Sequence, residues 1–459
     1  MIYYLFAGII EIFGQGVIKL RIFDFVYQIA TVFLIWNFLK NYDRKAAIFG
    51  AIVYASSYSA MNFSNTTQVE SFAGIPLIII LQILLKADKK IWHFLILGIL
   101  TGVLFNLKYT LGAVLLGFPL YFMIMGDNFL ESLKKNLYIS AGFLISLMPL
   151  AALFLDEYFR EGAANIMSYI SAYAAQDTTM ADFFKTIISK LYQHFIEMFS
   201  FLWAFAAFTG IFYLFVTNEK RIANAGIITV ILILMLNISI FVENKLLVYH
   251  FIRLYLPLSI LAGFGYIFFK RAAFDKINLL KYKSVLAAIL IIMIVFFSPL
   301  PRWVNTMRIP YYYLTDKSRY ISEYTRQGSV AFTYGYQLEV VDYLQKRMNK
   351  ADKLTVINSG LNIINHHFDV SRISGFAHSC FYLSTVRIED YRKSFLGDLH
   401  ESDYLVIQNN DVLTHLFFHD MSSYEAIMKD EEFSKTINNN FKHIKTIADF
   451  VIYEKAQGK

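Results

Sequence analysis

Three charged residues next to long apolar stretches could do chemistry in this sequence. Glu70 lies near the end of the polar stretch 54–72, which reads YASSYSAMNFSNTTQVESF, and Lys108 and Arg253 lie beside later apolar stretches. A carboxylate at the mouth of a helical bundle is rare enough to be a functional-site hypothesis by default. A carboxylate can act as a general base toward a hydroxyl group. Cations in a site poor in water can stabilise a departing anion.

Two of these residues also have purely structural explanations. Glu70 begins an apolar stretch, where a carboxylate can complement the dipole at the N-terminus of a helix. Lys108 can extend its ammonium group to the membrane interface. The sequence alone leaves both explanations open.

The composition is that of a membrane protein. The chain has 459 residues, of which 57% are hydrophobic and 17% aromatic, and its mean hydropathy is +0.47. These values suit a polytopic membrane protein and exclude an ordinary soluble one. The net charge of +7 does not indicate a nucleic-acid partner, because the basic residues lie between apolar stretches and have a topological role there.

Ten apolar stretches are predicted to span the membrane, so the predicted fold is mainly α and polytopic. Several are shorter than the ~20 residues of a straight span, which a bundle tolerates when it buries them. The predicted spans are 23–40, 46–58, 70–86, 92–106, 109–126, 136–155, 198–217, 222–242, 247–269 and 283–300.

Lysine and arginine set the predicted orientation. Fifteen of them lie in alternate connections, whereas the intervening short connections hold only Lys108 and Lys245. The positive-inside rule makes the basic connections cytoplasmic. Residues 54–72, the turn 106–109, the loop 156–197 and the tail from Pro301 are therefore predicted to face outward. The basic connections carry Lys40, Arg44, Lys45, Lys86, Lys89, Lys90, Lys134, Lys135, Lys220, Arg221, Lys270, Arg271, Lys276, Lys281 and Lys283.

The tail differs in composition from the membrane part. Residues 1–300 are predicted to form the transmembrane domain, 301–335 a linker and 336–459 an extracytoplasmic α/β domain. Helices (QLEVVDYLQKRM, IEDYRKSFLGDL, SYEAIMKDEEFSKTINNNF) alternate with strands (LTVIN, YLVIQ, IKTIADFVIYE), which predicts a largely parallel sheet. No phosphate-binding glycine loop follows these strands, so the domain is interpreted as a cap without its own chemistry. The loop stretch MADFFKTIISKLYQHFIEMF is predicted to be an amphipathic helix, lying in the membrane interface or packed against the tail.

Other candidate sites are weaker. His415 and His419 have the i, i+4 spacing of helical metal ligands, but no HExxH pattern accompanies them, and a solvated surface pair is the favoured interpretation. His366, His367 and His378 lack ligand spacing and are interpreted as structural.

Several stretches, in order, resemble the GT-C glycosyltransferases, the polyprenyl-phosphate-sugar-dependent enzymes related to protein mannosyltransferases and aminoarabinose transferases. The resemblance covers nearly the whole chain, and its order and spacing are more specific than any single motif. The matching stretches are YYLFAGIIEIFGQGVIKLRIFDFVYQIATVFLIW, SSYSAMNFSNTTQVESF with Glu70, NLKYTLGAVLLGFPLY with Lys108, HFIRLYLPLSILAGFGYIFF with Arg253, Tyr255 and Pro257, and the tail.

The resemblance implies an integral-membrane glycosyltransferase of the cytoplasmic membrane. An acceptor hydroxyl of a glycan, lipid or protein would attack the sugar of a polyprenyl-phosphate donor with inversion. Glu70 is then the catalytic candidate, and Gln68, Lys108 and Arg253 the substrate-binding ones. No cofactor is certain and no metal-ligating residue is assigned, although a divalent cation stays open.

The chain departs from the family at its beginning. The main catalytic acid of the family follows the first span, and this chain starts too late to contain it. Asp156 and Glu157 have suitable side chains but follow the wrong span. Ten spans would also place an N-terminus bearing Lys19 and Arg21 outside, so we expect Met1 not to be the true start of a functional enzyme.

Two other classes of protein remain open. A transporter or lipid flippase should show inverted repeats and broken helices in matched halves, and the sequence shows no such symmetry. A non-catalytic GT-C-like membrane protein or fragment is the other alternative, because the first acid is missing. A transfer assay with a lipid-phosphate sugar separates the three classes.

Overall fold

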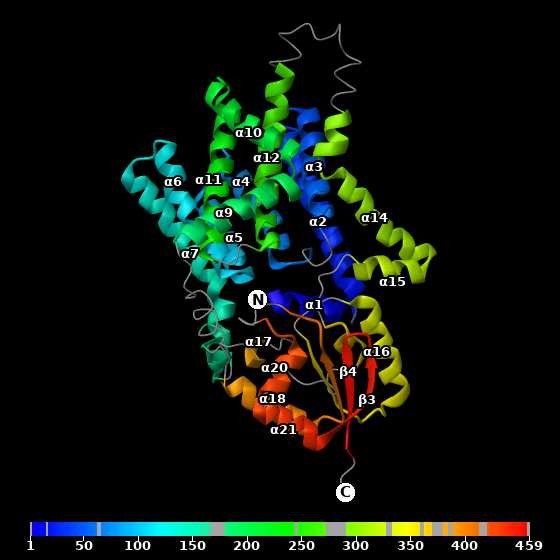
Figure 1. The fold of residues 1–459 in the computed structure, drawn as a ribbon. Helices are drawn as coiled ribbons and strands as arrows, with labels where there is room; N and C mark the ends of the chain where they lie inside the picture. Colours follow the sequence, from blue (N-terminus) through cyan, green and yellow to red (C-terminus); the bar gives the residue numbers. More distant parts are fainter. Residues whose placement is uncertain are drawn as a thin grey trace. The chain divides into compact units, whose positions relative to one another are not determined.

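The structure is a computed structural model that is mostly helical and divides into two compact units (Figure 1). One unit comprises Met1–Arg160 and Asp177–Met307, and the other comprises Glu161–Gln176 and Arg308–Lys459. The described residues are 2–14, 17–61, 66–157, 159–164, 167, 180–243, 247–271, 291–326, 333–358, 362–369, 380–383, 389–412 and 420–456.

The first unit is a bundle of apolar helices with short 3₁₀ segments at several helix ends. Its α-helices are α1 (Ile2–Phe13), α2 (Val17–Leu39), α3 (Arg44–Ser59), α4 (Gly74–Leu84), α5 (Ile91–Leu107), α6 (Gly117–Ile124), α7 (Phe129–Leu153), α9 (Met180–Tyr192), α10 (Phe201–Val216), α11 (Lys220–Val242) and α12 (Tyr255–Phe269). The 3₁₀ segments are η1 (Val69–Ala73), η2 (Tyr109–Leu116) and η4 (Val248–Leu254), and one π-helical turn, η3 (Gln193–Met198), follows α9.

Helices lie in the described residues of all ten predicted spans. Among the described residues, four helical stretches are long and apolar enough to cross a membrane: Lys19–Leu39, Phe129–Leu153, Lys220–Val242 and Val248–Phe269. Shorter apolar helices cover Val69–Leu84, Ile91–Leu107, Tyr109–Ile124 and Phe201–Val216. In the tenth predicted span, 283–300, residues 283–290 lie outside the described residues and 291–297 are helical. The count of ten spans stays a prediction.

Glycine lets two helix pairs approach closely. A Cβ atom on Gly210 of α10 would lie 1.9 Å from the carbonyl oxygen of Leu261, and one on Gly265 of α12 would lie 2.0 Å from that of Ala206. Helices α5 and α7 meet in the same way, since a Cβ atom on Gly98 would lie 1.9 Å from the Ile139 oxygen. Small residues at such crossings let membrane helices pack backbone against backbone.

The second unit contains a small sheet with helices on both faces. Its helices are α15 (Lys317–Arg326), α16 (Tyr334–Arg347), α17 (Cys380–Leu383), α18 (Glu389–Glu401), α20 (Ser423–Lys429) and α21 (Glu431–Asn440), with α14 (Leu300–Thr315) across the boundary between the units. The strands are β1 (Leu354–Ile357), β2 (Tyr404–Gln408), β3 (Phe441–Ile447) and β4 (Phe450–Lys455). Side chains of β2 alternate, so that Leu405 faces the core with α18 and α21 and Val406 faces the core with α16.

Three predictions for this unit were wrong in detail. The strand order is β1-β2-β4-β3, and only β1 and β2 are parallel, so the sheet is mixed rather than largely parallel. The predicted last strand is a hairpin, which turns at Ala448 with a φ of +50°. The predicted helix over SYEAIMKDEEFSKTINNNF is two helices, because Asp430 ends α20 and caps α21. Residues 301–335 contain most of α14 and all of α15, and their assignment as a linker stays a prediction.

Candidate functional site

Four charged side chains from distant parts of the chain meet in the first unit. Lys108 Nζ lies 2.5 Å from Glu70 Oε1 and 2.6 Å from Glu243 Oε2. Arg253 Nη2 lies 2.8 Å from Glu70 Oε1 and 2.8 Å from Glu243 Oε1. We call Glu70, Lys108, Glu243, Arg253 and the adjacent His250 the charged cluster.

Helix ends position this cluster. Glu70 lies in η1 just before α4, and Arg253 lies in η4 just before α12. Lys108 is the residue at which α5 ends in extended backbone, with φ −153° and ψ 122°, and Glu243 is the C-terminal cap of α11. Each side chain thus stands at the end of an apolar helix, and the packing of these helices brings the four charges together.

Burial decides which charge a ligand can reach. The side chain of Lys108 is 20% exposed, whereas those of Glu70 and Arg253 are 1% and 0% exposed. The Arg253 guanidinium also donates to the hydroxyl groups of Thr110 and Ser239. Buried charges need this degree of pairing to offset their desolvation. Lys108 is therefore the cation that a ligand would meet first.

His250 adds a titratable group to the cluster. Its Nδ1 lies 3.2 Å from Glu243 Oε2, and its Nε2 lies 4.0 Å from Glu70 Oε1.

Glu243 lies just past the end of α11. Burial raises the pKa of this carboxyl, but the charges of Arg253, His250 and Lys108 outweigh burial, so the pKa lies below its ordinary value. Glu243 is thus a carboxylate at neutral pH.

The cluster also offers ligand atoms for a metal ion. Glu70, Glu243 and His250 each present one such atom, all within 4.8 Å of one another. Lys108 and Arg253 already pair with both carboxylates, so a divalent cation here would add positive charge beside two buried or half-buried cations. The donor set suits a divalent cation only if Lys108 moves away from it.

The structure brings together three of the predicted site residues, Glu70, Lys108 and Arg253. Gln68 is the N-cap residue of η1, two residues before Glu70, and is only partly buried. Asp156 and Glu157 are exposed beyond the end of α7 and make local contacts with Phe159 and Arg160. His415, His419 and His378 lie outside the described residues, and His366 and His367 lie in a short 3₁₀ turn, η7 (Ile364–His367).

Sequence reasoning missed Glu243 and His250. Glu243 follows the predicted span 222–242 on the side assigned to Glu70, and His250 lies three residues before Arg253. The position of Glu243 was therefore a usable signal. His250 gave no usable signal, because a single histidine in an apolar stretch forms no recognisable sequence motif.

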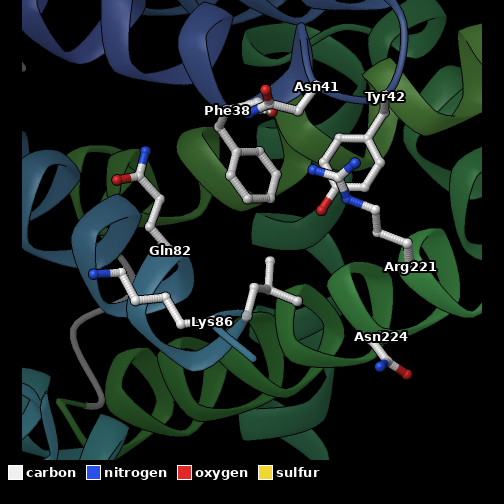
Figure 2. Close-up of a pocket in the computed structure, with 8 residues that line it drawn as sticks. Phe38, Asn41, Tyr42, Gln82, Lys86, Arg221 and Asn224 are labelled. Atoms are coloured by element: carbon white, nitrogen blue, oxygen red, sulfur yellow. Dashed lines mark hydrogen bonds between the residues drawn. The ribbon is translucent and has the colours of Figure 1, made fainter. Parts of the chain in front are cut away.

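A surface pocket of about 250 Å³ lies at the other end of these helices, and Figure 2 shows its lining. Glu70 lies just before the N-terminus of α4, whereas Gln82 and Leu85 of the lining lie at the C-terminal end of that helix. Arg221 and Lys86 are exposed members of the lining, and Arg221 stacks on Tyr42. None of these lining residues is a carboxylate. The lining residues are Phe38, Asn41, Tyr42, Gln82, Leu85, Lys86, Arg221 and Asn224.

Comparison with known proteins agrees with the predicted resemblance. Residues 1–153 match the family model of dolichyl-phosphate-mannose-protein mannosyltransferases. Two crystal structures of ArnT from Cupriavidus metallidurans are similar to this chain at 12% sequence identity, covering 97% of this chain and 85% of ArnT. The TM-score is 0.52 for the apo structure and 0.54 for the structure bound to undecaprenyl phosphate. A search of curated proteins gives no match. The chain thus shares the fold of the ArnT structures, and its first third matches the mannosyltransferase family model.

Proposed function

We propose that this chain, which has the fold of the GT-C protein ArnT, is an integral-membrane glycosyltransferase that uses a polyprenyl-phosphate sugar donor. The observation that carries the proposal is the charged cluster, in which a partly exposed lysine is backed by a fully buried arginine. Such a pair of cations suits the phosphate of a lipid donor. The undecaprenyl phosphate bound to ArnT supports the same class of ligand.

The reaction would exchange one bond at the anomeric carbon of the sugar for another. An acceptor hydroxyl, from a glycan, lipid or protein, attacks this carbon on the face opposite the phosphate, which inverts its configuration. The bond from carbon to phosphate oxygen breaks, and its electron pair stays on the departing polyprenyl phosphate. The hydroxyl proton passes to a carboxylate.

The contacts of Lys108 link donor binding to the supply of a base. Lys108 Nζ pairs with Glu70 Oε1 and Glu243 Oε2. A donor phosphate that binds Lys108 would replace one of these carboxylates as its partner. Glu70 would then keep only Arg253 as a cationic partner and could take the proton of the acceptor. Arg253 would hold Glu243 in place and keep the site positive behind the phosphate.

The orientation follows from the distribution of lysine and arginine. We place the charged cluster, with Gln68 at its edge, on the extracytoplasmic side of the cytoplasmic membrane. Residues 336–459 would form a domain on that same side. The positive-inside rule supports both assignments.

The test measures binding of the lipid phosphate by the full-length chain in detergent. Undecaprenyl phosphate should bind about tenfold or more tightly than undecaprenol, because it adds charge-assisted hydrogen bonds. Lys108→Met should remove this difference, whereas Lys40→Met in a predicted cytoplasmic connection should leave it intact. Transfer is then assayed with radiolabelled undecaprenyl-phosphate sugars. Equal binding of the two lipids by the unmodified chain would contradict the proposal and favour a non-catalytic membrane protein.

A further inference from the structure

A second buried carboxylate, Asp24 of α2, lies at the centre of a polar network next to η1. Asp24 is 4% exposed. Its Oδ1 accepts a hydrogen bond from Gln28 Nε2 at 2.9 Å, and its Oδ2 accepts from the Tyr58 hydroxyl at 2.7 Å and from Thr67 Oγ1 at 3.0 Å. A buried carboxylate in a membrane helix is expensive, and nothing in spanning a membrane requires one.

The network holds a backbone conformation that is unfavourable by itself. Thr67 has a φ of +60°, which is a genuine outlier for a β-branched residue. Its hydroxyl donates to Asp24 and accepts from Arg21 Nη1 at 2.8 Å, and its backbone N–H donates to the Tyr58 hydroxyl at 3.2 Å. These bonds keep Thr67 in the turn that leads into η1.

The same network also contacts Ser71, the residue that follows Glu70. Gln28 Nε2, which donates to Asp24, also donates to the carbonyl oxygen of Ser71 at 3.1 Å. The Tyr58 hydroxyl lies 3.0 Å from Ser71 Oγ. Glu70 is thus flanked by Thr67 and Ser71, and both are linked to Asp24, directly or through one side chain.

We propose that Asp24 is a positioning residue that fixes η1, so that the Glu70 carboxylate meets Lys108 and Arg253. An ionised carboxylate only accepts hydrogen bonds, so it forces the donors of Gln28, Tyr58 and Thr67 to point at one place. An asparagine in its place would turn an N–H group toward one of these donors. The inference deepens the proposed function, and its kinetic part rests on it.

The first experiment needs no enzymatic activity. Hydrogen exchange is followed by mass spectrometry in the peptide that covers residues 67–73 of the full-length chain. Asp24→Asn should speed exchange there by about tenfold or more, because buried hydrogen bonds are lost. Asp43→Asn, which removes the charge that pairs with Lys270 at the other end of the unit, should leave this peptide unchanged. Unchanged exchange in Asp24→Asn would overturn the proposal.

Tyr58→Phe provides a second variant in case Asp24→Asn does not fold. It keeps the ring and removes only the hydroxyl between Asp24 and Ser71. The same peptide should exchange faster in this variant. Unchanged exchange in a folded Tyr58→Phe chain would also contradict the proposal.

The second experiment separates positioning from general damage. Asp24→Asn should lower kcat about tenfold or more with KM changed less than about twofold, since only the reacting geometry is disturbed. Added to Glu70→Gln, it should lower kcat by less than about twofold, because both changes act on one carboxylate. Fully additive losses would mean a merely structural role. An unmodified chain without transfer activity would contradict the proposed function, and the exchange experiment would still decide the role of Asp24.

Discussion

Lys108 and Arg253 contact the same two carboxylates from different directions, and this arrangement balances the charges of the cluster. Glu70 Oε1 receives both cations, at 2.5 Å from Lys108 and 2.8 Å from Arg253. Glu243 uses both its oxygens, one for each cation. Two negative and two positive charges therefore cancel when His250 is neutral. The proposed donor phosphate would upset this balance, and its binding would then act directly on the carboxylates.

Glu70→Gln tests this balance at one residue. The change keeps the shape of the side chain but removes its charge and its ability to take a proton. Turnover should fall by ~10²-fold or more, as it does when a general base or its positioning is lost. The measurement is sugar transfer by purified full-length chain, with a melting curve to confirm folding.

Glu219→Gln is the matched control for that prediction. Glu219 pairs with Arg271 at an exposed site, so its loss should change turnover less than twofold. Near-normal turnover in Glu70→Gln would return Glu70 to a structural role at the start of α4.

The sequence predicts part of this site, and the reason is physical. Glu70, Lys108 and Arg253 stand out because charge beside apolar stretches is rare. Asp24 lies in an apolar stretch too, but its role depends on Tyr58 and Thr67, which are 34 and 43 residues away in sequence. Such contacts follow from helix packing, and no local sequence pattern predicts them.

Glu454 of β4 gives the second unit a predictable pH dependence. The hydrogen bond from Arg347 holds the pKa of this carboxyl below its ordinary value, and the Tyr404 hydroxyl adds to the effect. The folded pKa is thus lower than the unfolded one of about 4.3. The pair stabilises the strand fully above that value, and this contribution is lost as the pH falls through the folded pKa.

The measurement is hydrogen exchange of the β4 peptide in the full-length chain, corrected for the intrinsic effect of pH. Exchange should accelerate as the pH falls below about 4.3. Glu454→Gln should exchange faster at neutral pH and show a weaker acceleration. Parallel curves for the two chains would exclude this pair as the source.

At the scale of elements, the helix pair α10–α12 depends on two glycines that face each other's backbone. Gly210→Ala or Gly265→Ala would place a Cβ atom at about 2 Å from a carbonyl oxygen. Each change should destabilise the chain by about 1–3 kcal/mol or more, because the helices must separate. Thermal unfolding in detergent measures the effect.

Gly8→Ala in α1 is the control for the glycine prediction. A Cβ atom at Gly8 has no heavy atom within 4 Å, so the change should be neutral or slightly stabilising in a helix. Equal melting temperatures for all three variants would show that the α10–α12 crossing tolerates a wider separation.

Elements were predictable where one periodic signal dominates. The apolar helices follow from hydropathy, and α16 and α18 follow from their helical patterns. The hairpin of β3 and β4 was missed because its turn contains Ala448 and Asp449 rather than the glycine or asparagine that marks such turns. The break between α20 and α21 depends on Asp430, whose side chain accepts from Glu432 and Phe433 and pairs with Arg392.

At the scale of the whole molecule, the predicted orientation can be tested with Cys380, the single cysteine. In sealed right-side-out vesicles, an impermeant thiol reagent added outside should label Cys380, because the positive-inside rule places the tail on the outer side. Mild denaturation precedes labelling, since cysteine is usually buried. Mass spectrometry of the labelled chain is the measurement.

A cysteine in a predicted cytoplasmic connection serves as the comparison. Asp88→Cys combined with Cys380→Ser should react only when the vesicles are opened. Labelling of Cys380 from the cytoplasmic side alone would reverse the orientation and move the charged cluster to the inner face.

The separation in sequence between members of the charged cluster also determines the order in which they are synthesised. Lys108 is 38 residues beyond Glu70, and Arg253 is 183 residues beyond it. At ~5–20 residues per second, a ribosome delivers Lys108 about 2–8 s after Glu70, and Arg253 about 10–40 s after it. Glu70 therefore acquires its first partner early in synthesis and its second only when the helices that carry Glu243 and Arg253 have emerged.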